Sequence, residues 1–311
     1  MKKTFLGMFL VASWVGGAVP FQPYNPYYHN ALADVRLRIV DDLGEPVEGA
    51  TVAASFYIGD TKTTGLTKDT GKDGVVEAKY PCNGEFKVWA RKDGYYETLL
   101  KTDAFITLSK EEATKTRRWS NGTVDIPVVL KKMRNPVKTE RFFVNFATIP
   151  VTNEVVCLDL ETFRWCPPYG NGKHRDLHLL YESWQNPTNW FSYYRKLTIT
   201  TPNCVDGFCV GKLDSFSRFR YAYVADTNAV YRPAFVMELD RRSGSITRNQ
   251  KPAEDEYLTY RVRTQTNEFG KITTANYGRI GEKPSHMFGL RMSSWFNPRP
   301  NDTNLEDARP W

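Results

Sequence analysis

The segment DVRLRIVDDLGEPVEGATV, residues 34–52, alternates apolar and polar side chains and then reverses direction. Its apolar residues Val35, Leu37 and Ile39 recur at every second position, which is the pattern of a strand with one buried face. The GEPVEGA that follows, residues 44–50, supplies the glycines and the proline that a tight turn requires. The segment therefore predicts a β-strand followed by a sharp turn.

Residues 67–96 repeat this alternation between turns, in TKDTGKDGVVEAKYPCNGEFKVWARKDGYY. The segments GEPVEGATV, DTGKDG, PCNGEFKVWA and KDGYY resemble the carboxypeptidase regulatory-like domains, small transthyretin-like β-sandwiches found in many secreted bacterial proteins. The resemblance spans roughly residues 33–133 and carries no catalytic residue. It implies an N-terminal sandwich that serves as a structural or binding module.

The N-terminus has the order of a secretory signal peptide. Lys2 and Lys3 precede an apolar run at residues 5–15, and small residues follow it. We expect residues 1–18 to be cleaved on export, residues 19–32 to form a flexible linker, and the mature protein to be secreted or held at the cell surface. No later run reaches the ~18 consecutive apolar residues of a membrane span.

The remainder of the chain predicts a second β domain. MRNPVK marks a junction, so we expect sandwiches at residues 33–134 and 135–295 and a nonregular tail at 296–311. The predicted fold class is all-β, with a transthyretin/Ig-like sandwich followed by a larger, jelly-roll-like one. One short helix is expected in SKEEATKTRR, residues 109–118, capped by Ser109. The strands expected in the second domain are 141–147, 176–181, 196–201, 219–224, 234–239, 256–263 and 289–295.

Five cysteines in an exported chain indicate disulfides. The Asp-Gly turn in CVDGFC would place Cys204 opposite Cys209 across a hairpin, at a separation that suits a disulfide. A hairpin between Cys157 and Cys166 would pair those two cysteines by the same geometry. Cys82 is then left over, either buried and inert or bonded to another chain.

HRDLH offers a metal-like pattern of side chains. If the segment is a strand, His174, Asp176 and His178 share one face, and two imidazoles with a carboxylate suit a transition metal. The opposite face is largely apolar, so the polar side of a half-buried strand is the preferred interpretation. We therefore expect no metal and no cofactor.

Glycoside hydrolysis requires paired carboxylates, and Asp159, Glu161 and Glu182 lie near aromatic clusters in the sequence. A chain with 35 acidic residues offers such groups by chance, and no G-x-S-x-G motif is present. The net charge is only +7, and the basic groups at 115–118 and 131–134 suit solvated loops. The sequence thus favours neither an enzyme nor a nucleic-acid-binding protein.

Residues 181–196, YESWQNPTNWFSYYRK, concentrate aromatic side chains among turn-forming amides and a proline. This is loop composition, and rings held on a surface loop can stack on sugar faces or anchor a protein partner. The alternative is that most of these rings cap the sandwich core. The candidate binding residues are Tyr181, Trp184, Trp190, Tyr193 and Tyr194.

LKKMRNPV, PPYGNGKHRDLHL and WFNPRPNDTNLE resemble a group of secreted bacterial proteins that has no assigned function. This resemblance spans nearly the whole mature chain. The sequence therefore predicts an exported, non-catalytic protein that binds a glycan or a cell-surface partner through its second domain. Two alternatives stay open, a structural subunit of a surface layer or appendage and a carbohydrate-active enzyme. None of these features predicts the oligomeric state.

Overall fold

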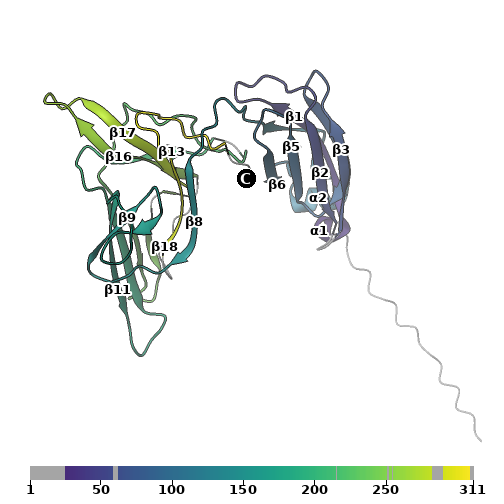
Figure 1. The fold of residues 1–311 in the computed structure, drawn as a ribbon. Helices are drawn as coiled ribbons and strands as arrows, with labels where there is room; N and C mark the ends of the chain where they lie inside the picture. The colour runs from purple at the N-terminus through teal and green to yellow at the C-terminus, as the bar shows by residue number, and fades with distance from the viewer. Residues whose placement is uncertain are drawn as a thin grey trace, which may run out of the picture.

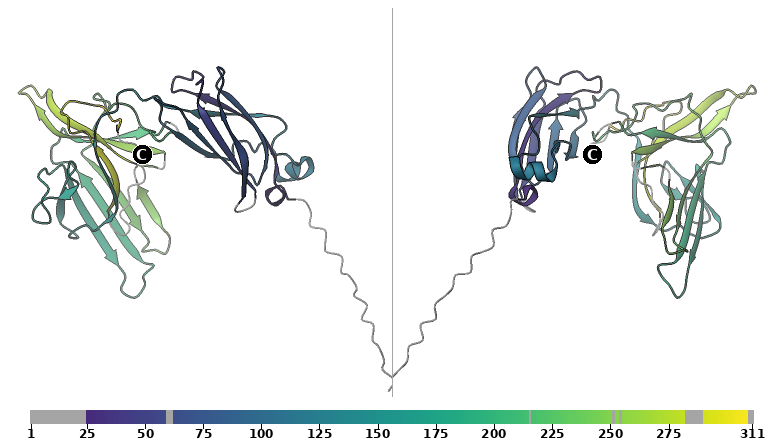
Figure 2. Two further views of the ribbon diagram at one scale, coloured as in Figure 1. Left: turned by 45° about the vertical axis from the view of Figure 1, so that its right-hand side comes forward. Right: turned by 180° about the vertical axis from the view of Figure 1, so that it is seen from behind.

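A computed structural model describes residues 25–58, 62–214, 216–250, 252–253, 255–281 and 290–308. Strands make up nearly all of the regular structure, and they form two bodies, an N-terminal and a C-terminal sandwich (Figure 1). The predicted all-β sandwich class is confirmed. Both views in Figure 2 show the two sandwiches side by side.

The N-terminal sandwich packs a three-stranded sheet, β4-β1-β7, against a four-stranded sheet, β3-β2-β5-β6. β1 is antiparallel to β4 and parallel to β7. Its alternation buries Val35, Leu37 and Ile39 completely in the core, as predicted. The elements of this half are α1 (Pro26–His29), β1 (Ala31–Val40), β2 (Thr51–Ile58), β3 (Lys62–Asp69), β4 (Val75–Cys82), β5 (Phe86–Arg91), β6 (Thr98–Thr102), α2 (Lys110–Thr116) and β7 (Val124–Val129).

Residues 25–32 do not form the flexible linker that we expected. They contain α1 and the first residues of β1. Asn25 caps α1 by accepting a hydrogen bond from the Tyr27 N–H at 3.1 Å, and the Tyr27 ring packs edge-on against Trp119 with ring centroids 4.9 Å apart. The segment is thereby tied to the N-terminal sandwich. The expected signal peptide lies outside the described residues.

The short helix expected near residue 110 is present as α2. The Ser109 hydroxyl accepts a hydrogen bond from the Glu112 N–H at 3.3 Å, and the Glu112 carboxylate accepts one from the Ser109 N–H at 2.9 Å. This reciprocal pair fixes the start of the helix. Within the part of the chain that the structure describes, neither helix has the length and apolar character to cross a membrane.

The C-terminal sandwich packs a six-stranded sheet, β10-β9-β11-β12-β14-β15, against a five-stranded sheet, β13-β16-β17-β18-β8. Most neighbouring strands follow one another in the sequence. The chain passes between the sheets four times, between β8 and β9, before and after β13, and between β15 and β16. Leu197 and Met237 from one sheet and Val262 and Ile280 from the other are fully buried in the shared core. The strands are β8 (Glu140–Ala147), β9 (Val155–Asp159), β10 (Arg164–Trp165), β11 (Leu177–Gln185), β12 (Tyr193–Thr200), β13 (Gly207–Lys212), β14 (Ala234–Asp240), β15 (Thr247–Gln250), β16 (Glu256–Thr266), β17 (Ile272–Ile280) and β18 (Leu290–Phe296).

The strand expected at residues 219–224 is wrong. Phe219 and Tyr221 alternate as they would in a strand, but this segment is irregular and both rings are buried. Every other strand expected in the second domain coincides with an observed strand. The alternation at 219–224 instead serves the contact between the two sandwiches.

That contact, the junction, is a cluster of aromatic rings and buried charges. Phe219 is fully buried and stacks on Tyr96 from the N-terminal half, with ring centroids 4.9 Å apart. Lys131, which we expected in a solvated loop, is only 2% exposed. Its Nζ donates to the Asp214 carboxylate and to the Tyr221 carbonyl, each at 2.6 Å. The buried ammonium is therefore paired, as a charge removed from water must be.

The C-terminal residues close the junction. Residues 297–308 contain no regular strand. Glu306 is 1% exposed, and its carboxylate accepts hydrogen bonds from the Arg134 N–H at 3.0 Å, the Asn135 N–H at 2.9 Å and the Tyr96 hydroxyl at 3.1 Å. One carboxylate thus links the tail to the segment between the two sandwiches.

Arg279 is a second buried cation of the junction. It is fully buried, and its Nε donates to the Leu305 carbonyl at 3.1 Å. Its Cζ lies 4.0 Å and 3.9 Å from the ring centroids of Tyr221 and Trp295, so the negative ring faces stabilise the guanidinium. Burial nevertheless lowers the pKa of Arg279 to about 10.

The hairpin register predicted for Cys157 and Cys166 is right, but the disulfide is absent. The Cys166 N–H donates to the Cys157 carbonyl at 2.8 Å. Cys157, in β9, therefore lies opposite Cys166, which directly follows β10. Both are free thiols, and the Cys166 Sγ–H donates to the His174 carbonyl at 3.2 Å.

The expected Cys204–Cys209 disulfide is absent because the predicted hairpin does not form. Gly207 begins β13, which pairs with β16 and places Cys209 opposite Thr259. Cys204 lies in the preceding turn and is exposed, and both thiols are free. Cys82 is fully buried, and burial raises the pKa of its thiol to about 11, which agrees with the inert alternative.

Candidate functional site

The β11–β12 hairpin carries the aromatic residues that the sequence singles out. Its strands pair from His178 opposite Thr200 to Gln185 opposite Tyr193, which leaves residues 186–192 as the loop. Of the five candidates, only Trp190 lies in the loop. The amides and the proline predicted a loop over residues 181–196, whereas the structure has strands up to Gln185 and from Tyr193 onward.

Side-chain amides hold the backbone of the loop. Asn186 Oδ1 accepts from the Asn189 N–H at 3.2 Å, and Asn189 Oδ1 accepts from the Phe191 N–H at 3.0 Å. Gln185 Nε2 donates to the Trp190 carbonyl at 3.1 Å. Because the amides satisfy the backbone, the rings are left to point outward, and Trp190 is 79% and Phe191 69% exposed.

Strand alternation divides the other four candidates between two faces. Tyr181 and Tyr193 lie on the inner face, where Tyr193 is 7% exposed and Tyr181 packs against the core. These two residues are therefore corrected from surface candidates to packing residues. Trp184 and Tyr194 are direct cross-strand neighbours on the outer face, where Trp184 is 46% exposed.

The aromatic side chains that remain available at this end of the six-stranded sheet are Trp184, Trp190, Phe191 and Tyr194, and we call them the aromatic end. Cations accompany two of these rings. Arg242 Cζ lies 4.5 Å from the Tyr194 ring centroid, and Arg241 Cζ lies 5.3 Å from that of Phe191. Asp240 holds Arg242 in place through two contacts of 3.0 Å to Nε. The rings thus lie among fixed charges.

The outer face continues with paired charges next to the rings. Lys196 Nζ is 3.2 Å from Glu182 Oε2, and the two residues form the cross-strand pair beyond Trp184 and Tyr194. Partial burial, and then the nearby Glu238, raise the pKa of the Tyr194 hydroxyl, which is therefore a proton donor at neutral pH. The aromatic end combines ring faces with hydrogen-bond donors and acceptors.

The three residues considered for a metal do not come together. β11 begins only at Leu177, so His174 and Asp176 lie in irregular chain and do not share a strand face with His178. Asp176 is buried and bound by Arg263, whereas His178 is half-buried on the outer face. Among the described residues no group of three or more His, Cys, Asp and Glu side chains is placed to hold a metal.

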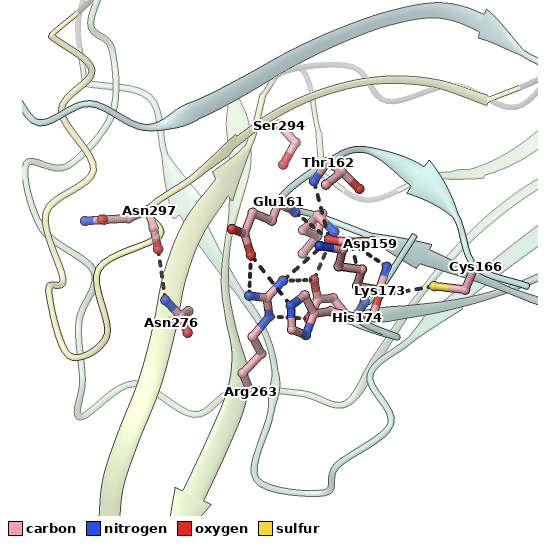
Figure 3. Close-up of polar contacts among 12 residues, drawn as sticks. Asp159, Glu161, Thr162, Cys166, Lys173, His174, Arg263, Asn276, Ser294 and Asn297 are labelled. Carbon is pink, nitrogen blue, oxygen red and sulfur yellow. Dashed lines mark hydrogen bonds and ion pairs between the residues drawn. The ribbon is translucent and has the colours of Figure 1, made fainter. Parts of the chain in front are cut away.

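A charged cluster that the sequence did not reveal lies beside the β9–β10 hairpin. Figure 3 shows the Arg263 guanidinium directed toward Glu161, with Asp159 and His174 beside it. Arg263 donates to both Asp176 oxygens, at 2.8 and 2.9 Å, and to Glu161 Oε2 at 2.7 Å. Arg263 leaves the β16 ladder at a register shift and has a φ of 56°, which turns its side chain toward these carboxylates.

Asp159 is the buried carboxylate of this cluster. It is fully buried, and its two carboxylate oxygens accept backbone N–H groups from Glu161 at 2.9 Å, Lys173 at 2.8 Å and His174 at 3.3 Å. Burial would raise the pKa of this carboxyl, but the backbone donors outweigh burial and hold the pKa below its ordinary value of 3.8. Asp159 therefore ties two loops together as a carboxylate that is ionised at neutral pH.

The carboxylates considered for glycoside hydrolysis are divided by the fold. Asp159 and Glu161 both contact Arg263, whereas Glu182 lies on the outer face in its pair with Lys196. A general acid in such a reaction needs a raised pKa, and the carboxyl of Asp159 has a lowered one. This cluster has the chemistry of a structural clamp.

The similarity of the chain to known proteins is distant. No family model matches it, and no curated protein does. A streptococcal ancillary pilin aligns with 90% of this chain at 14% identity and a TM-score of 0.24, and the alignment spans 63% of the pilin. A proposed carbohydrate-binding protein from Bacteroides uniformis aligns with 88% of this chain and 98% of its own length, at 7% identity and a TM-score of 0.20. Similarities this low carry no argument about function.

Proposed function

We propose that the chain is an exported, non-catalytic protein that binds a glycan through its aromatic end. The observation that carries this proposal is the exposure of Trp184, Trp190 and Phe191 on a hairpin whose loop is held by its own side-chain amides. Large exposed apolar side chains that gather at one place on a soluble surface are typical of binding sites. The rigid loop lowers the entropy that a ligand must remove on binding.

The chemistry of the aromatic end suits a sugar. The C–H face of a sugar ring is weakly positive and apolar, and it stacks on the negative face of an indole or phenyl ring. The Glu182–Lys196 and Asp240–Arg242 pairs lie next to the rings and provide acceptors and donors for hydroxyl groups. Because these four charges are already paired with one another, they do not demand a charged ligand.

A glycan array with the purified mature protein tests this function. We expect specific retention that falls by about tenfold or more in Trp184→Ala and in Trp190→Ala, since central aromatic anchors carry much of a binding energy. Phe269→Ala is the matched control, because Phe269 is 84% exposed but lies in the turn between β16 and β17. Its retention should equal that of the parent chain.

The two alternatives give different results in the same experiment. Concentration-dependent polymers without glycan retention support a structural subunit of a surface layer or appendage. Release of reducing ends from the arrayed glycans supports a carbohydrate-active enzyme. Equal retention by Trp184→Ala, Trp190→Ala and the parent chain would remove the aromatic end as the binding site.

A further inference from the structure

A separate groove of about 530 Å³ opens in the C-terminal sandwich where β13 and β14 diverge. Its walls are largely apolar and come from both sheets, with Phe208, Val210 and Leu258 on one side and Val230, Ala234 and Val236 on the other. Val210 is 48% and Val230 81% exposed. Two β-branched apolar side chains at the groove are thus exposed to solvent.

β13 presents an open backbone edge to this groove. Phe208 and Arg232 exchange two backbone hydrogen bonds, at 2.8 and 2.9 Å, so the even-numbered residues of β13 direct their N–H and C=O groups away from β16. The next such residues are Val210 and Lys212. β13 is an edge strand whose ladder partner is β16, so these outward backbone groups have no backbone hydrogen-bond partner among the described residues, and the Val210 carbonyl accepts a weak hydrogen bond from the Cys209 Sγ–H at 3.8 Å. The pairing that begins at Phe208 therefore stops where the groove opens.

We propose that this groove binds an extended segment of a partner polypeptide, which pairs with the free edge of β13 as an added strand. An unpaired strand edge is a template for another strand, and the apolar walls accept alternate side chains of that strand. The inference is independent of the glycan-binding proposal, because none of the groove residues belongs to the aromatic end.

The geometry defines the chemistry of the occupant. Residues between 230 and 236 line the groove together with β13, so a single extended segment fits between them, whereas the edge of a folded second copy brings its neighbouring strands with it. The side chains that face the walls should be β-branched and apolar. Arg232 lines the groove, is exposed and forms no ion pair within the described part of the chain. Glu256 also lines the groove, but its carboxylate is already paired with Lys212 at 3.1 Å, so an acidic residue of the segment complements Arg232.

The probe is a fluorescein-labelled seven-residue peptide that alternates threonine and valine and carries one central glutamate. Titration of the full mature chain should raise its fluorescence polarisation to saturation. The same peptide with N-methyl groups at alternate backbone nitrogens should bind about tenfold more weakly, because it loses two hydrogen bonds of about 0.5–1.5 kcal/mol each. Equal binding of the two peptides would overturn strand addition.

Variants of the chain test the same surface. Val210→Pro removes the outward N–H of an edge strand, a position where proline is tolerated, and should weaken binding of the unmethylated peptide about threefold, because it removes one hydrogen bond where N-methylation removes two. Val230→Asp should also weaken binding of the peptide, because it places a charge in the apolar wall of the groove. The variant should still fold, because the exposed Val230 side chain contributes little to the fold. Thermal midpoints check that both variants are folded, and both should retain the glycan affinity of the parent chain. No saturable binding of the peptide, or a dimer of the chain that Val210→Pro dissolves, would refute a partner segment as the occupant.

Discussion

The junction and the aromatic end are built from the same side chains and have opposite surroundings. At the junction Phe219 is fully buried and Tyr221 nearly so, and Lys131 and Arg279 lie against their rings. At the aromatic end, rings of the same kinds also lie beside arginines, but Trp190 is 79% exposed. Aromatic and cationic composition therefore does not distinguish a structural contact from a binding surface.

The two regions differ because other segments of the protein pack over the junction, whereas none packs over the exposed rings of the aromatic end within the described residues. Residues 297–308 and the end of the N-terminal sandwich close over the junction, where Glu306 joins three segments. The loop at 186–192 satisfies its own backbone and has no such cover. Burial makes the junction a source of stability, while exposure leaves the rings of the aromatic end accessible to solvent.

The largest expected effect is at the centre of the junction. Phe219→Ala should lower the free energy of unfolding by ~3–5 kcal/mol, because it removes a fully buried ring that stacks on Tyr96. Urea denaturation followed by tryptophan fluorescence measures this difference. A loss below ~1 kcal/mol would mean that the two sandwiches contribute little to each other's stability.

A smaller loss is expected when the carboxylate that joins the segments becomes an amide. Glu306→Gln keeps the shape of the side chain but replaces one carboxylate oxygen with an NH2 group. In the parent chain the two oxygens accept the N–H groups of Arg134 and Asn135, so the new NH2 group faces another donor. A buried donor without an acceptor costs about 1–3 kcal/mol. The same denaturation experiment measures it, and an unchanged midpoint would show that the tail does not hold the junction.

The clamp beneath the β9–β10 hairpin should contribute to the response to acid. The pKa of Asp159 lies below its ordinary value of 3.8 in the folded chain, so the folded state binds fewer protons than the unfolded one. Its contribution is present above that ordinary value and is lost as the pH falls through the folded pKa. Asp159→Asn should cost ~1–3 kcal/mol at neutral pH and show a shallower loss of stability in acid. Parallel pH profiles of the two proteins would contradict this assignment.

The sequence predicted what depends on local period. Val35, Leu37 and Ile39 identify β1 because alternation is a property of consecutive residues, and the register of Cys157 against Cys166 followed from hairpin length. Arg263 could not be found in this way, because its role depends on a backbone irregularity that directs it to carboxylates about 90 to 100 residues away in the chain. The strand predicted at Phe219 is wrong for the same reason, because the ring is buried by segments that are distant in the sequence, such as the one that carries Tyr96.

The smallest expected effect on stability is at the aromatic end, and it decides the comparison. Trp190→Ala should change the free energy of unfolding by less than ~0.5 kcal/mol, because a side chain that is 79% exposed loses little contact on truncation. Tyr193→Ala is the matched control three residues further along the same hairpin, and it should cost ~2–5 kcal/mol because Tyr193 is 7% exposed against the core. If both variants unfold at the parent midpoint, the inner face of the hairpin is not packed as described. If both are strongly destabilised, Trp190 supports the fold as Phe219 does, and the aromatic end is then no more available for binding than the junction.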